Sequence, residues 1–120
     1  MKPITSSWAI DVDDTLQSRV EDGSLVFRGP GRTVSIDCMG KRESREETVA
    51  RLRAEAAPAL VDECDGVVHR LVFAGAGGGP FTLHAYAVDD REVLMMAIRY
   101  DDASDADWAC AVGRSASRRR

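Results

Sequence analysis

Cysteine and histidine, the side chains that most often mark metal and redox sites, are scarce in this sequence. The chain of 120 residues has three cysteines, Cys38, Cys64 and Cys110, and two histidines. No two of the cysteines form a C-x-x-C pair, which removes the strongest sequence signal for zinc binding or thiol redox chemistry. An odd number of isolated cysteines is typical of reduced thiols and argues against a disulfide framework.

Long apolar runs and an excess of basic residues are also missing. No hydrophobic stretch approaches the roughly 20 residues of a membrane-spanning helix, and residues 1–8 lack the apolar core of a secretory signal. The formal net charge is −4, and four arginines lie at positions 114 and 118–120, so residues 1–113 carry −8. Because an acidic body repels phosphate backbones, we expect no nucleic-acid binding. We expect a cytoplasmic protein without membrane insertion.

Residues 23–40 have the pattern of a β-hairpin. A short apolar run at 25–27 is followed by the turn residues Gly29-Pro30-Gly31. Residues 33–38 then alternate strictly, with Val34, Ile36 and Cys38 on one side and Thr33, Ser35 and Asp37 on the other. A period of two predicts a strand with one buried face and one solvent face.

The clearest helical pattern covers residues 44–57. Ser44 and Glu47 have the spacing of a capping box, which marks the first turn of a helix. Val49, Leu52 and Ala56 recur at helical spacing on one stripe. Pro58 then predicts the end of the helix, because proline in a helix interior removes a backbone hydrogen bond.

Three strand-like segments follow at 67–73, 81–88 and 92–100, and residues 104–113 form a short C-terminal helical pattern. Segment 92–100 is apolar on both faces, which is typical of a central, covered strand. A glycine-rich link at 74–80 precedes a strand and lacks the Lys-Ser/Thr ending of a phosphate-binding loop. Together these elements predict one α+β domain over 1–120, with an antiparallel sheet of about six strands covered by two helices. We expect residues 1–7 and 114–120 to fray.

The order of these elements resembles that of the PsbP-like α/β superfamily. The resemblance spans residues 8–117 and is carried by residues 23–31 before a strand, the acidic helix start at 44–47, the three late strands, and the ending at 111–115. This superfamily includes a photosystem subunit, a nuclear-import factor that binds Ran, and DcrB-like chaperones of type VI secretion effectors. The resemblance implies a protein-binding role and no catalytic residues.

A second resemblance is confined to one short motif. Asp11-Val12-Asp13-Asp14-Thr15 reads as D-x-D-x-T, the first motif of the haloacid dehalogenase-like phosphatases. That resemblance implies a Mg²⁺-dependent phosphohydrolase with Asp11 as nucleophile and Asp13 as acid/base, and with no turnover after Asp11→Asn. The chemistry requires a buried parallel strand before Asp11, and the βαβ units of such a sheet are missing here. An Asp-rich turn after a short strand is the simpler interpretation.

Other polar clusters have simple structural interpretations. The acidic segment 101–107 lacks the glycine and the final glutamate of a calcium-binding loop, and acidic residues there suit a helix N-terminus. His69 and His84 lie on predicted strands, where lone histidines usually occupy the polar face of a sheet. We therefore expect no metal site and no cofactor.

Tyr86, Met95, Met96 and Tyr100 are the candidate binding residues. If helices cover only one face of the sheet, a Met- and Tyr-rich surface on the other face is suited to an apolar helix of a protein partner or to a second copy of the chain. If both faces are covered, the same residues belong to the core. The leading hypothesis is a small binding or adaptor protein, chaperone-like and without enzymatic activity. A pocket for a small apolar ligand is a further alternative.

Overall fold

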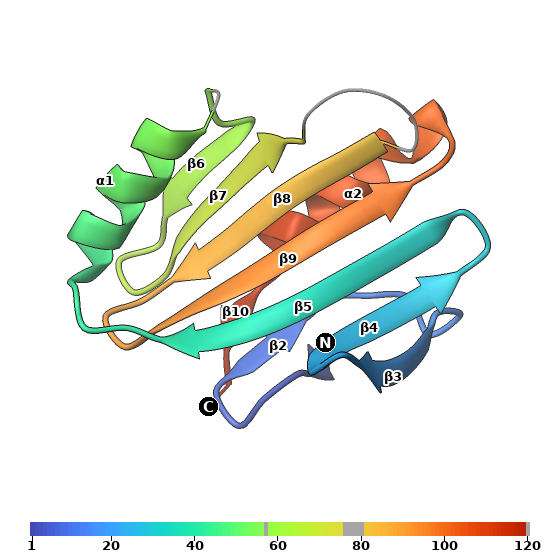
Figure 1. The fold of residues 1–120 in the computed structure, drawn as a ribbon, viewed down its shortest axis with the longest axis horizontal. Coiled ribbons are helices and arrows are strands. Elements are labelled where there is room, and N and C mark those ends of the chain that lie inside the picture. Colours follow the sequence, from blue (N-terminus) through green and yellow to red (C-terminus); the bar gives the residue numbers. More distant parts are fainter. Residues whose placement is uncertain (57, 76–80, 120) are drawn as a thin grey trace.

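The computed structural model of the protein describes residues 1–56, 58–75 and 81–119. Its main element is a 7-stranded sheet in the order β3-β4-β5-β9-β8-β7-β6, with every neighbouring pair antiparallel (Figure 1). These strands are β3 (Gln17–Glu21), β4 (Ser24–Gly29), β5 (Arg32–Gly40), β6 (Val61–Cys64), β7 (His69–Ala74), β8 (Phe81–Val88) and β9 (Glu92–Tyr100). The predicted α+β class and antiparallel sheet are confirmed, with one strand more in this sheet than the approximate number expected.

A second, smaller sheet has 3 strands in the order β1-β2-β10. They are β1 (Lys2–Pro3), β2 (Trp8–Ile10) and β10 (Ser117–Arg118). Both outer strands pair antiparallel with β2, so the two ends of the chain lie on either side of one strand. The segments that we expected to fray therefore include paired strands in the structure.

The two predicted helices are confirmed, with small shifts in their bounds. The main helix α1 spans Arg45–Glu55, and its capping box is present: Glu47 N donates to Ser44 Oγ at 3.1 Å, and Ser44 N donates to Glu47 Oε1 at 3.4 Å. The C-terminal helix α2 spans Ala106–Arg114 and follows a short 3₁₀ turn, η1 (Ala103–Asp105). Residue 57, the predicted end of the main helix, and most of the predicted glycine-rich link lie outside the described residues.

The main core lies between the large sheet on one side and α2 with the small sheet on the other. Alternate side chains of β5, β8 and β9 point into this core, and they include Val34, Ala85, Leu94 and Ile98. Trp8 and Ile10 from β2 enter the same core and are fully buried. Helix α2 packs closely because Gly113 presents no side chain to Ala85, Val72 and Ile98. This packing buries the central strands on the α2 face of the sheet.

Helix α1 covers only one end of the opposite face. Val49 and Leu52 of α1 form a second apolar cluster with Leu71, Phe73, Val88 and Val93 from β7, β8 and β9. Figure 1 shows α1 beside β6 and β7, whereas β3, β4 and β5 lie at the other end of the sheet. The part of this face near β4 and β5 is therefore left without a helix in the described chain.

Among the helices of the described residues, none combines the length and apolarity needed to cross a membrane.

Candidate functional site

The candidate site is the part of the large sheet that neither helix covers. Two cross-strand rows of side chains form it, because residues paired across antiparallel strands share a face. One row is Val26, Ser35, Ala97 and His84, and the next is Arg28, Thr33, Arg99 and Thr82. We call these eight residues the open face. Apart from buried Val26, their side chains are exposed or half-buried.

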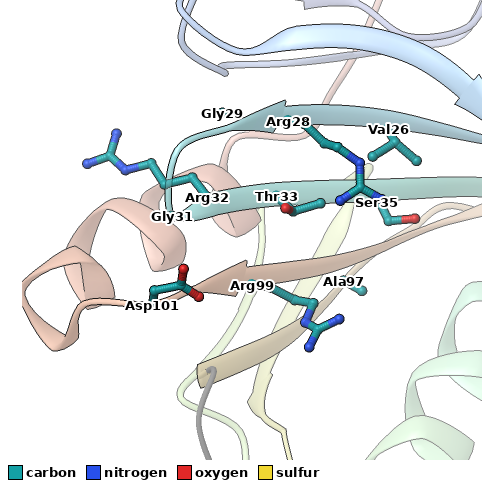
Figure 2. A pocket seen from close by; sticks show the side chains of 10 residues that line it. All are labelled: Val26, Arg28, Gly29, Gly31, Arg32, Thr33, Ser35, Ala97, Arg99 and Asp101. Atoms are coloured by element: carbon teal, nitrogen blue, oxygen red, sulfur yellow. The ribbon is translucent and has the colours of Figure 1, made fainter.

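A hollow of about 570 Å³ lies over the β4–β5–β9 part of the open face (Figure 2). Its floor is formed by short side chains, among them Thr33, Ser35 and Ala97. The Pro30-Gly31 turn closes one end, where Gly31 has a φ of 71°, a left-handed conformation that favours glycine. A Cβ at Gly29 would lie 2.5 Å from Leu16 Cδ2, so a larger residue there would require the end of the Leu16 side chain to move.

Two arginines flank the floor of this hollow. Figure 2 shows Arg28 and Arg99 on either side of Thr33, whereas Arg32 extends away from both. Arg28 binds Glu21 with Nε–Oε2 at 2.9 Å and Nη2–Oε1 at 3.2 Å. Arg99 is exposed and has no ion-pair partner within the described parts of the chain. The margin of the uncharged floor therefore carries the guanidinium of Arg99 and that of Arg28, which is paired with Glu21, and Asp101 also lines the hollow.

The four predicted binding residues are divided between the two faces of the sheet. Tyr86 and Met95 are cross-strand partners on the face that carries α1, where they are half-buried at the margin of the α1 cluster. Met96 and Tyr100 point the opposite way and are only 2% and 7% exposed in the main core. A partner on the open face can therefore reach Tyr86 and Met95 but not Met96 or Tyr100.

This division follows from strand geometry. Met95 and Met96 are consecutive, and consecutive side chains of a strand point to opposite faces. The predicted polar side of residues 33–38 is confirmed, since Thr33 and Ser35 lie on the open face and Val34 in the core. Sequence reasoning missed Arg28 and Arg99. The signal available for Arg99 was its polar character at the end of an otherwise apolar strand.

The Asp11–Thr15 motif lies in different surroundings from those that a phosphatase requires. The strand before it, β2, is short and antiparallel to both neighbours. Arg32 Nη1 binds Asp13 Oδ2 at 2.9 Å, and Arg32 Nη2 binds Asp105 Oδ1 at 2.8 Å. The Arg32 guanidinium also lies 4.4 Å from the centre of the Trp108 ring. These contacts give Asp13 a structural role in joining the first loop to the α2 region.

Metal binding has no geometric support among the described residues. No group of three or more His, Cys, Asp and Glu side chains within them is arranged to hold an ion. Asp11 contributes its backbone N–H to Ser115 Oγ at 2.9 Å, which fixes the backbone and leaves the carboxylate outside this contact. The parts needed for Mg²⁺-dependent phosphoryl transfer are therefore not brought together in these ranges.

A second polar cluster lies between α1 and the β6–β7 hairpin. Arg53 binds the Asp62 carboxylate through two contacts of 2.7 Å, and His69 Nε2 lies 2.6 Å from Asp62 Oδ1. The hydrogen bonds from Arg53, assisted by His69, lower the pKa of Asp62 to about 2. The cluster fixes α1 against the edge of the sheet.

Acid is expected to weaken this cluster in a defined pH window. Because the pKa of Asp62 is lower in the folded than in the unfolded protein, its stabilisation is present above about pH 4 and is lost as the pH falls towards about 2. We expect Asp62→Asn to lower the free energy of unfolding by about 1 kcal/mol at neutral pH, after allowance for solvent screening. The difference from the wild type should shrink between pH 4 and pH 2 in urea titrations. Asp14→Asn, at a side chain 98% exposed, is the control and should show a smaller difference.

The Cys38 thiol is expected to react more slowly than the exposed Cys64 thiol. Burial, together with a contact of 3.2 Å from Sγ to Glu92 Oε2, raises the pKa of Cys38 to about 12. Cys64 is exposed. Because the thiolate is the reacting form, iodoacetamide should modify Cys38 at least about tenfold more slowly than Cys64 at pH 8. Peptide mass spectrometry measures both rates, and urea should remove the difference; equal rates in the folded protein contradict the prediction.

Comparisons with known proteins returned no relatives. A scan against protein-family models found no match, and searches of curated proteins and of solved structures found none either. The resemblance to the PsbP-like superfamily therefore stays a prediction, and the candidate site depends on the geometry described above.

Proposed function

We propose that the protein is a cytoplasmic protein-binding adaptor, chaperone-like in type, whose open face receives a helix of a partner protein. The observation that carries this proposal is the uneven covering of the large sheet. Helix α2 and the small sheet cover one face, but the α1 cluster on the other face reaches only β7, β8 and the start of β9. A sheet surface with short side chains at its centre allows a helix backbone to approach closely.

The chemistry of the open face specifies an amphipathic helix. Its apolar residues would lie over Ala97 and extend towards Tyr86 and Met95, where a shallow hollow of about 140 Å³ adjoins the open face. Its acidic residues would lie at Arg99, because guanidinium groups bind carboxylates through paired hydrogen bonds and Arg28 is already paired with Glu21. The resemblance to a superfamily that includes effector chaperones also supports a protein partner.

Site-directed photo-crosslinking tests this proposal. A photoreactive amino acid at Ser35 should capture one partner in cells, whereas the same amino acid at Val67, which is 62% exposed on a distant turn, should not. Arg99→Glu should reduce capture from position 35 about tenfold, because it places a like charge opposite the acidic side of the partner helix. Equal capture from both positions, no capture from position 35, or capture unaffected by Arg99→Glu contradicts the proposal.

A further inference from the structure

The outer edge of β3 is an unpaired strand edge. β3 is the first strand of the large sheet and pairs only with β4 among the described residues (Figure 1). Four of its five residues are exposed, including Val20, whose exposed fraction is 72%. Natural proteins usually protect such edges with charged side chains, above all lysine, with proline or with a bulge. β3 contains neither proline nor lysine and pairs with β4 in continuous register, and the charges on it are those of Arg19 and Glu21.

The geometry of the β3–β4 hairpin determines which backbone groups point outward. Asp22 and Gly23 have φ values of 51° and 85° and form a two-residue turn. In such a hairpin the flanking residues, Glu21 and Ser24, exchange backbone hydrogen bonds, and the next pair, Val20 and Leu25, does not. The N–H and C=O of Val20 therefore point to the open edge, away from β4.

We propose that a second copy of the chain pairs with this edge, β3 against β3 in antiparallel orientation, centred on Val20. The two Val20 residues then exchange backbone hydrogen bonds and place their exposed side chains against each other. Arg19 lies opposite Glu21 of the second copy, and this pair occurs twice because the contact is symmetric. Opposite charges on facing strand positions stabilise the pairing.

The charges on the outer strands favour pairing in this register and at the β3 edge. A register centred on Arg19 places two arginines directly opposite each other, which is destabilising. The other outer strand, β6, contains Asp62 and Glu63, so pairing two β6 strands would bring carboxylates together. Among the two outer strands of the sheet, β3 is thus the one whose charges favour a second copy.

The expected dimer is weak and depends on concentration. A five-residue strand buries less surface than the 1,200–2,000 Å² typical of stable interfaces. The two-fold axis runs perpendicular to the sheet, so the two sheets become continuous and both open faces lie on the same side. The dimer would present two partner-binding surfaces in one plane.

Cysteine crosslinking tests the register. Val20→Cys, made together with Cys64→Ser to remove the exposed native thiol, places two sulfurs on hydrogen-bonded facing positions. The Cα separation of about 5.5 Å at such positions suits a disulfide. With diamide as oxidant, we expect covalent dimer at least about tenfold faster than from Val67→Cys, which is similarly exposed at 62%. Equal rates, or faster crosslinking of Arg19→Cys in the same background, overturn the proposal.

Sedimentation equilibrium tests the charge pairing without crosslinks. We expect the wild type to associate reversibly to a dimer and Arg19→Glu to raise the dissociation constant about tenfold. The double variant Arg19→Glu/Glu21→Arg should restore part of the association, because it exchanges the two charges of each pair while Arg28 loses its partner Glu21. Circular dichroism confirms that each variant is folded. A monomer at the highest concentration reached, species larger than a dimer, or failure of the double variant to restore association overturns the proposal.

Discussion

Replacing Gly113 with leucine is expected to lower the free energy of unfolding by about 3 kcal/mol, as measured by urea denaturation. A Cβ at this position would lie 3.0 Å from Ala85 Cβ, 3.2 Å from Val72 Cγ2 and 3.4 Å from Ile98 Cδ1. Side-chain atoms beyond Cβ would have to displace α2 from the sheet. Helix propensity acts in the opposite direction, because leucine favours a helix more than glycine does. A loss of stability therefore measures the packing of α2 on the sheet.

Two further substitutions distinguish the steric effect of a side chain at Gly113 from the general effect of replacing a glycine. Gly113→Ala adds only the Cβ and should cost about 1 kcal/mol, because the neighbouring atoms need to move by only a few tenths of an ångström. Gly40→Leu is the control, since no heavy atom lies within 4 Å of a Cβ at Gly40. It should change stability by less than about 0.5 kcal/mol. A Gly113→Leu variant as stable as Gly40→Leu would show that α2 does not pack as described.

Trp8→Ala is expected to lower the free energy of unfolding by about 3–5 kcal/mol, the usual cost of removing a fully buried aromatic ring. Trp8 is 0% exposed and connects the small sheet to the main core. The Arg118 guanidinium lies 5.2 Å from its ring centre, so the substitution also removes a contact with β10. Chemical denaturation followed by circular dichroism measures the loss.

A conservative variant and a matched control test whether the stability comes from burial of the Trp8 ring. Trp8 Nε1 is buried without a hydrogen-bond partner among the described residues, so Trp8→Phe should cost much less than Trp8→Ala. Phe81→Ala removes an aromatic ring that is 44% exposed and should cost about 1 kcal/mol. If Trp8→Ala costs no more than Phe81→Ala, the small sheet does not contribute to the core.

The elements that sequence reasoning found are those encoded by local patterns. The capping box at Ser44 and Glu47 located α1, because cap and helix lie within four residues of each other. The alternation at 33–38 gave both the strand and its buried side. β1 and β10 were missed because two-residue strands have no measurable period, and their pairing with β2 joins opposite ends of the chain.

The candidate site was predicted less well than the fold, for a related reason. Arg28 and Arg99 lie beside the same hollow only because β4, β5 and β9 pair with one another. This pairing joins segments that are far apart in the sequence. Tyr86, Met95, Met96 and Tyr100 were grouped by residue type, although alternation along β9 separates Met95 from Met96. The position of α1 on the sheet determines which strands remain uncovered on that face. This position depends on packing between distant segments and cannot be predicted from any one of them.

The pairing of both chain ends with β2 sets an order for folding during synthesis. Residues 8–10 leave the ribosome early, but β10 joins them only after residues 117–118 have emerged. Until then Trp8 lacks its strand pairing with Arg118 and the contact of the Arg118 guanidinium with its ring. A chain interrupted within α2 would thus lack β10, and β2 would keep only its pairing with β1 in the small sheet.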